Sequence, residues 1–193
     1  MSEFKSFEKG IETNAIQPFI VGSMSKESRL AILKNHGLEY NEDPNTFYDL
    51  QKFLNAFEEV KNQFGEMNLF LIGKAVIDNA QFPPINNLKE ALQSLDIAYH
   101  MNHRKDGKAM FNPENGLMLD GIGHYRLEKY DAETKTAEMV CHTPYPSKFE
   151  EGLILQIVRR FKPAGSIRTK VELDESKETR RRGGQSCTFS ISW

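Results

Sequence analysis

The amino-acid sequence predicts an α+β fold in which a helical N-terminal half packs on an antiparallel sheet and the C-terminal half has the order ββαββ. The first observation behind this class is a change in periodicity near residue 105. Apolar residues recur at helical spacing before that point, whereas alternating and β-branched stretches follow it. The second is that no linker rich in Gly, Ser or Pro interrupts the 193 residues. We therefore expect one domain over 1–193, helical over about 1–104 and ββαββ over about 105–193.

Two helices are predicted in the first third of the chain. Ser25 is a typical N-cap of the first, and Gly37 suits the position just after its end. The second follows the Pro44-Asn45-Thr46 sequence and ends at Gly65. Its apolar residues fall on one stripe at i, i+3 and i+4 spacing: Phe47, Leu50, Phe53, Leu54, Phe57 and Val60.

Two more helices complete the helical half. The segment 68–79 is apolar over most of its circumference, which is typical of a helix that is buried or that walls a cavity. The Phe82-Pro83-Pro84 sequence separates it from a fourth helix, because the residue before a proline disfavours helical geometry. This fourth helix starts at about Asn87 and runs to the 100–103 region.

The second half reads as four strands and one helix. The segments with strand patterns are 125–130, 137–143, 167–173 and 187–193. The first two flank the polar stretch 131–133 and predict a hairpin. Ser147 is expected to cap a helix over 148–161. The last two strands are joined through the Arg180-Arg181-Arg182-Gly183-Gly184 sequence.

Composition excludes several classes of protein. With 25 Lys and Arg against 27 Asp and Glu, the net charge of −2 offers no chain-wide attraction to nucleic acid. Two cysteines cannot build a disulfide framework, and no apolar leader precedes the first charges. The longest apolar runs, such as 69–72, are too short to cross a membrane. These features favour a cytoplasmic protein.

The histidines at the end of the fourth predicted helix allow two interpretations. His100 and His103, three residues apart, could share a helix face and bind one metal ion, completed by His124, Cys141 or His142. Alternatively, histidines at a helix C-terminus interact with the negative end of the helix dipole, and the adjacent residues Cys141 and His142 point to opposite faces of a strand. No second tight pair of ligands is present, so the structural interpretation is preferred.

The charged clusters of the sequence do not indicate a catalytic site. The arginines at 159–160 and 180–182 could dock an acidic partner, but we favour a solvated helix end and a charged hairpin tip. The carboxylate pairs 58–59 and 150–151 are expected on solvated helix surfaces. No nucleophile elbow, phosphate loop or dinucleotide fingerprint occurs, so the chain is not expected to be an enzyme. The apolar helices predict either a generous core or a core with a ligand-sized hollow.

Short motifs resemble two related families. The segment 89–96 (KEALQSLD), followed closely by a histidine, resembles the proximal helix of haem nitric oxide/oxygen-binding (H-NOX) domains, and 125–193 resembles the second half of that fold. The C-terminal half is also similar to 4-vinyl reductase-type ligand-binding domains. That family typically has a cysteine, then a glycine, then a cysteine before its last strand. Gly183 and Cys187 match the second and third of these positions, and Thr179 stands at the first. Cys141 matches the cysteine near the ligand region.

The resemblance to H-NOX domains implies a haem, but its two haem motifs depart from the family pattern. Counting from Leu95-Asp96 places Tyr99 where the iron ligand is expected, with His100 one residue further. The family's Tyr-x-Ser-x-Arg motif, which holds the haem propionates, stands here as Tyr145-Pro146-Ser147-Lys148-Phe149. A phenylalanine cannot replace the arginine's charged hydrogen bonds. If haem is bound, the resemblance implies His100 as the iron ligand.

Together these observations predict a cytoplasmic sensory or regulatory domain that binds a small apolar ligand and acts on a signalling partner in trans. Its expected ligand-binding residues are Tyr99, His100, His103, Cys141, Tyr145, Ser147 and Phe149. One alternative is a haem-based sensor of NO or O2 that uses His100. Another is a dimeric scaffold without a ligand, as in the related transport-particle subunits. By analogy with these families, a homodimer is expected in each case.

Overall fold

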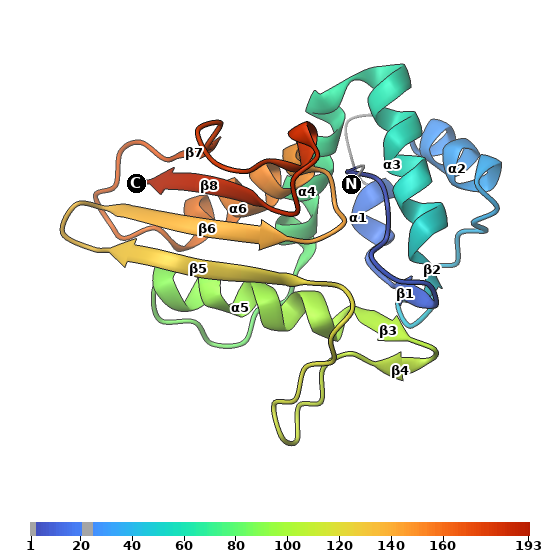
Figure 1. Ribbon diagram of the computed structural model, residues 1–193, viewed down its shortest axis with the longest axis horizontal. Helices are drawn as coiled ribbons and strands as arrows, with labels where there is room; N and C mark the ends of the chain where they lie inside the picture. Colours follow the sequence, from blue (N-terminus) through green and yellow to red (C-terminus); the bar gives the residue numbers. More distant parts are fainter. Residues whose placement is uncertain (1–2, 21–24) are drawn as a thin grey trace.

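The predicted α+β class is confirmed by the structure, a computed structural model that describes residues 3–20 and 25–193 (Figure 1). Within those residues the chain forms six α-helices and two four-stranded antiparallel sheets. The smaller sheet, which the sequence did not predict, has the order β2-β1-β3-β4. The larger sheet has the order β5-β6-β8-β7. Its four strands, with the helix between the second and third along the chain, form the predicted ββαββ half.

The N-terminal half contains five of these helices. They are α1 (Gln17–Ile20), α2 (Lys26–Asn35), α3 (Leu50–Phe64), α4 (Glu66–Asn79) and α5 (Leu88–Met101). The strands of the smaller sheet are β1 (Ile11–Thr13), β2 (Tyr48–Asp49), β3 (His103–Lys105) and β4 (Lys108–Ala109). Because β3 follows α5 after one residue, this sheet ties the end of α5 to the N-terminal segment.

Helix ends follow the predicted signals at most positions. Ser25 accepts a hydrogen bond from the Ser28 amide and caps α2, and Gly37 lies just beyond the end of α2 with φ of 69°. Gly65 ends α3, and the Asn87 side chain caps α5. Phe47 was wrongly included in the second helix: α3 begins only at Leu50, after the short strand β2.

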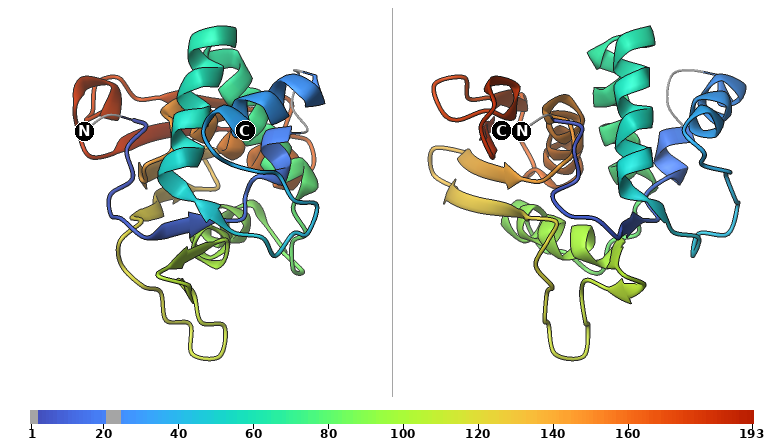
Figure 2. Two further views of the ribbon diagram at one scale, coloured as in Figure 1. Left: turned by 90° about the vertical axis from the view of Figure 1, so that its right-hand side faces the viewer. Right: turned by 45° about the vertical axis from the view of Figure 1, so that its right-hand side comes forward.

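The C-terminal half builds one layered unit. Its elements are β5 (His124–Asp131), β6 (Thr136–His142), α6 (Ser147–Phe161), β7 (Lys170–Leu173), the 3-10 turn η1 (Arg180–Arg182) and β8 (Cys187–Ser192). Helix α6 covers one face of the larger sheet, while α5 runs along the β5 edge (Figures 1 and 2). Ser147 does not cap α6, because Pro146 holds that position, and residues 167–169 precede the strand rather than belonging to it.

The two halves meet where α4 crosses α6. A Cβ atom on Gly73 would lie 2.0 Å from the Phe149 carbonyl oxygen, and one on Gly152 would lie 2.0 Å from the Phe70 carbonyl oxygen. Each glycine therefore lets the other helix's backbone approach, which requires the absence of a side chain. This crossing explains why α4 is apolar over most of its surface: it is buried against α6.

Aromatic rings fill the interior between α3, α5 and α6. Neighbouring ring centroids along the row Phe19, Phe53, Phe57, Phe149, Tyr145, Tyr99 and Tyr125 lie between 4.9 and 6.1 Å apart. These distances are those of packed aromatic pairs. The region where the sequence allowed a ligand-sized hollow therefore holds a packed core. No helix in the described part of the chain combines the length and apolar composition that a membrane crossing requires.

Candidate functional site

Tyr99 lies at the centre of the predicted ligand-binding residues. Its hydroxyl donates a hydrogen bond to the Ile122 carbonyl oxygen at 2.7 Å. The ring packs against His103, Tyr125 and Tyr145, with centroids 4.6, 5.1 and 6.1 Å away. Burial raises the pKa of Tyr99 well above its ordinary value, so the hydroxyl stays protonated. Tyr99 is therefore fully engaged in the core and presents no free polar atom to a ligand.

His103 is buried with both ring nitrogens hydrogen-bonded. Its Nδ1 lies 2.7 Å from the Tyr99 carbonyl oxygen, which can only accept, so Nδ1 carries the hydrogen. Its Nε2 then accepts from the Tyr145 hydroxyl at 3.0 Å. Burial lowers the pKa of His103 from 6.5 to about 4, which keeps the ring neutral at physiological pH. His103 has the properties of a structural histidine.

Tyr145 connects His103 to a buried ion pair that the sequence analysis missed. Arg180 donates to the carbonyl oxygens of Cys141 at 2.6 Å and Tyr145 at 2.8 Å, and to the Glu150 carboxylate. The Arg180 and Glu150 side chains are 1% and 0% exposed, so the expectation that both were solvated is wrong. We call His103, Thr143, Tyr145, Glu150 and Arg180 the Tyr145 network.

Glu150 is held in this network from two sides. Thr143 donates to its second carboxylate oxygen at 2.6 Å. Burial raises the pKa of Glu150 to about 7, and the charge of Arg180 opposes that rise. No sequence signal links these residues, since Arg180 and Glu150 are 30 positions apart. The network joins η1 to the start of α6 and has the character of a structural anchor.

Ser147 and Phe149 lie on the first turn of α6 and face different surroundings. The Ser147 hydroxyl accepts from Arg181 Nε at 2.9 Å. The Phe149 ring stacks on Tyr145 with centroids 5.2 Å apart and meets Phe57 edge-on at 5.2 Å. Phe149, which stands where the haem-binding motif has an arginine, is thus part of the aromatic core.

Cys141 lies on β6 directly opposite Cys187 on β8, and both thiols are free and buried. Burial raises the pKa of both, of Cys187 to about 11, so the thiolate form that binds metals is disfavoured. The neighbouring His142 is exposed and stacks on Phe7 at 4.8 Å. His142 lies opposite His124 in the β5–β6 register, but the possible ligand atoms that lie within 4.8 Å of one another around His100 come from neither Cys141 nor His142.

His100 differs from all of these residues because one of its nitrogens has no hydrogen-bond partner within residues 3–20 and 25–193. The side chain is fully buried on α5, and its Nδ1 lies 2.8 Å from the Asp96 main-chain oxygen one turn earlier. Its Nε2 has no partner among the described residues. A buried polar atom left unpaired costs about 1–3 kcal/mol, so it calls for an explanation.

Asp96 and His124 surround His100. The His100 and His124 ring centroids lie 4.9 Å apart, with 31° between the ring planes. Asp96 accepts from the Tyr125 amide at 2.9 Å with one carboxylate oxygen and lies 3.0 Å from His124 Nδ1 with the other. We call Asp96, His100 and His124 the His100 site. One possible ligand atom from each lies within 4.8 Å of the others. The spacing of Asp96 and His100, one helical turn apart, is a signal that the sequence analysis could have used.

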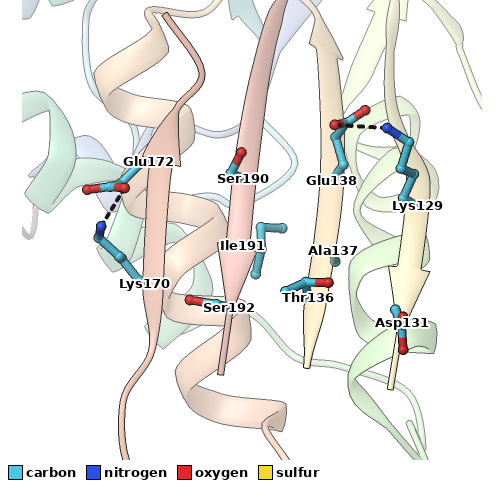
Figure 3. Close-up of a pocket in the computed structure, with 10 residues that line it drawn as sticks. All are labelled: Lys129, Asp131, Thr136, Ala137, Glu138, Lys170, Glu172, Ser190, Ile191 and Ser192. Carbon is cyan, nitrogen blue, oxygen red and sulfur yellow. Dashed lines mark hydrogen bonds and ion pairs between the residues drawn. The ribbon is translucent and has the colours of Figure 1, made fainter. Parts of the chain in front are cut away.

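A concave region lies on the outer face of the larger sheet (Figure 3). Its volume is about 550 Å³. Most of its charged side chains form ion pairs, Glu172 with Lys170 and Glu138 with Lys129 and Lys177, while Asp131 accepts from the Glu133 and Thr134 amides. These pairs are typical of a solvated sheet face, so we place the candidate site at His100 instead.

Comparison with known proteins links this chain to a haem protein by fold. No protein-family model matches it, and no curated protein sequence matches it. Among solved structures, one described as "Modulating Heme Redox Potential Through Protein-Induced Porphyrin Distortion" is similar with a TM-score of 0.61. The two share 18% sequence identity over 94% of this chain and 97% of that one. At this identity the similarity establishes the fold alone.

The residues of this chain do not fit a haem held as the resemblance implied. Tyr99, at the iron-ligand position, is bonded to Ile122 and enclosed by aromatic rings. The His124 ring lies next to His100, and Phe149, in the arginine position, is stacked on Tyr145. A porphyrin between α5 and α6 would have to displace this core.

Proposed function

We propose that this chain is a regulatory, non-catalytic domain whose ligand is recognised through His100 Nε2 at the end of α5. The observation that carries the proposal is the Nε2 atom, which is fully buried and unpaired within the part of the chain that the structure describes. Both ring nitrogens of the neighbouring buried histidine, His103, are hydrogen-bonded. The fold can therefore provide partners for a buried histidine in this region. A ligand supplies the partner that His100 lacks.

The position of His100 suits a regulatory role because α5 connects several parts of the fold. Asp96 binds the start of β5, and His103, just beyond the helix, connects to α6 through Tyr145. A ligand shifts only those states that it binds unequally, so binding at His100 would act by moving α5 relative to β5. The outer face of α5 carries Ile97 and Met101, which are 40% and 54% exposed. We assign this exposed stripe to a protein partner in trans, in the cytoplasm.

A ligand that copurifies with the protein tests this function. Native mass spectrometry of the full chain should show an added mass that is lost in His100→Ala. His36→Ala is the matched control, since His36 is 25% exposed and its Nε2 hydrogen-bonds Glu59 at 2.7 Å, away from α5. Hydrogen exchange of the α5 amides should slow on ligand binding in the wild type and in the control. A ligand retained by His100→Ala would overturn the proposal.

Haem is the second candidate ligand, favoured by the fold shared with a haem protein. Titration with haemin distinguishes haem from another ligand bound through His100. We expect no Soret band beyond that of free haemin, because the aromatic core occupies the space next to Tyr99. A bound-haem band lost in His100→Ala and kept in Tyr99→Phe would support an H-NOX-type sensor instead. A tight homodimer that binds no ligand at all would favour the scaffold alternative.

A further inference from the structure

The hydrogen bonds of His100 determine which of its nitrogens carries the hydrogen. Nδ1 lies 2.8 Å from the Asp96 main-chain oxygen, which has no hydrogen to donate. Nδ1 is therefore the donor, and in the neutral ring Nε2 holds a lone pair. That lone pair is buried and has no partner in the described part of the chain.

The same reasoning applies to His124. Its Nδ1 lies 3.0 Å from Asp96 Oδ2, and a carboxylate only accepts hydrogen bonds. Nε2 of His124 is therefore also a lone-pair nitrogen when the ring is neutral. The two rings lie side by side, with centroids 4.9 Å apart and planes 31° from parallel. Two basic nitrogens of the same kind are thus presented by neighbouring rings.

Asp96 orients both rings. Its main-chain oxygen binds His100 Nδ1, and its two carboxylate oxygens bind His124 Nδ1 and the Tyr125 amide. In metal sites, histidine ligands commonly donate their second ring N–H to a carboxylate or a main-chain carbonyl, which fixes the tautomer and raises ligand basicity. Asp96 supplies one interaction of each kind.

We propose that His100 and His124 bind a divalent transition-metal ion of the zinc type through their Nε2 atoms, with Asp96 as the positioning residue. This inference rests on the proposed function and names the chemical class of its ligand. Imidazole nitrogens suit zinc, nickel, copper and iron, whereas calcium and magnesium prefer oxygen ligands. Two protein ligands leave coordination positions for water or for an oxygen donor.

Burial and two nearby carboxylates act on the His100 ring in opposite directions. Burial, the largest influence, lowers the pKa of His100, so the ring is neutral at physiological pH and its lone pair is available. Asp96 and Asp120 lie close enough for their negative charges to act on His100 in the opposite direction. His124 is 23% exposed and Asp96 is 18% exposed, so this side of the site is in contact with solvent.

Calorimetric titration of the metal-stripped full chain with Zn2+ tests the site. We expect one equivalent to bind, and His124→Ala and His100→Ala each to weaken binding at least tenfold. His36→Ala should leave the affinity unchanged. Because His124 is partly exposed, its variant keeps the test valid if His100→Ala fails to fold. Absence of Zn2+ binding, or unchanged affinity in His124→Ala, would overturn the inference.

The role of Asp96 needs a readout that a purely structural effect would not give. Asp96→Asn should lower Zn2+ affinity by about 10–100-fold, as for other residues that orient a ligand. Long-range proton–nitrogen spectra of the five histidine rings should show Zn2+ shifting the Nε2 resonances of His100 and His124 alone. Coordination through Nδ1 of His124 would instead make Asp96 a ligand and contradict its positioning role.

Failure of this inference is distinguishable from failure of the proposed function. If the metal-stripped protein retains an organic molecule that His100→Ala loses, the regulatory site stands and the metal inference is overturned. If neither Zn2+ nor a copurified molecule binds in a His100-dependent manner, both are overturned.

Discussion

The Tyr145 network and the His100 site are two polar clusters that both contact the Tyr99 ring, and they differ in how completely their hydrogen-bonding groups are paired. In the network, both nitrogens of His103 are bonded, and Glu150 accepts from Arg180 and Thr143. In the His100 site, each histidine is held through Nδ1, and no described residue pairs with His100 Nε2. The fully paired first cluster stabilises the fold, whereas the second leaves the lone pair of His100 Nε2 for the proposed ligand.

Local sequence makes this contrast instructive. His100 and His103 are three residues apart and each places Nδ1 against the carbonyl oxygen of the residue four positions earlier. Their difference arises only at Nε2, where Tyr145 meets His103 while the His124 ring lies beside His100. The roles of two similar histidines thus depend on residues that are distant in the chain.

The largest effect is expected from breaking the Tyr145 network at its ion pair. Arg180→Met leaves the Glu150 carboxylate buried without its cation and should lower the free energy of unfolding by about 3–5 kcal/mol. Urea denaturation at pH 7 measures this. The double variant Arg180→Met with Glu150→Leu should recover most of the loss, and equal losses in the single and double variants would contradict the pairing.

The next largest effect is expected in the pH dependence of the free energy of unfolding, to which His103 of the Tyr145 network contributes. The pKa of His103 is about 4 when folded, against 6.5 ordinarily. Unfolded chains therefore bind a proton that the folded state refuses, and stability falls as pH drops from 6.5 to 4, by about 3 kcal/mol in total from this group. His100 and His142 add losses of the same sign, because burial lowers their pKa values too. Glu150 acts in the opposite direction, because its pKa is raised to about 7 and the folded state binds its proton more readily. When the free energy of unfolding is measured at several pH values, it should fall less steeply from pH 6.5 to 4 for His103→Leu than for the wild type.

At pH 7 the substitution His103→Leu itself should cost about 1–3 kcal/mol, since it removes the buried hydrogen bonds that His103 makes with the Tyr145 hydroxyl and the Tyr99 carbonyl. Tyr145→Phe removes the other end of the same hydrogen bond. The two costs should be non-additive in a double-mutant cycle followed by urea denaturation. Strict additivity would show that the bond does not contribute to stability.

The smallest effect on stability is expected at the His100 site. His100→Leu without metal should leave the free energy of unfolding within about 1 kcal/mol of the wild type, because it removes a polar atom that had no partner. The Asp96 carbonyl keeps its helical hydrogen bond. In a hundredfold excess of Zn2+ over its dissociation constant, only the wild type should gain about 2.7 kcal/mol. A loss as large as that of His103→Leu would place His100 in the structural class.

The sequence predicted the elements well where the signals were local. The N-cap Ser25, the helix-ending Gly37 and Gly65, and the hairpin of β5 and β6 are all confirmed. It misplaced the features that depend on packing. Ser147 looked like a cap but accepts from Arg181, and Arg180 looked solvated but is buried.

By itself, the sequence determined the α+β class, the order of the elements and the presence of histidines at the end of α5, because periodicity and capping act within a few residues. Only the tertiary structure decided that aromatic rings fill the space between the helices and that His124 lies beside His100. Burial and hydrogen-bond satisfaction are properties of neighbours in space. Those neighbours come from strands and helices that the chain brings together only on folding.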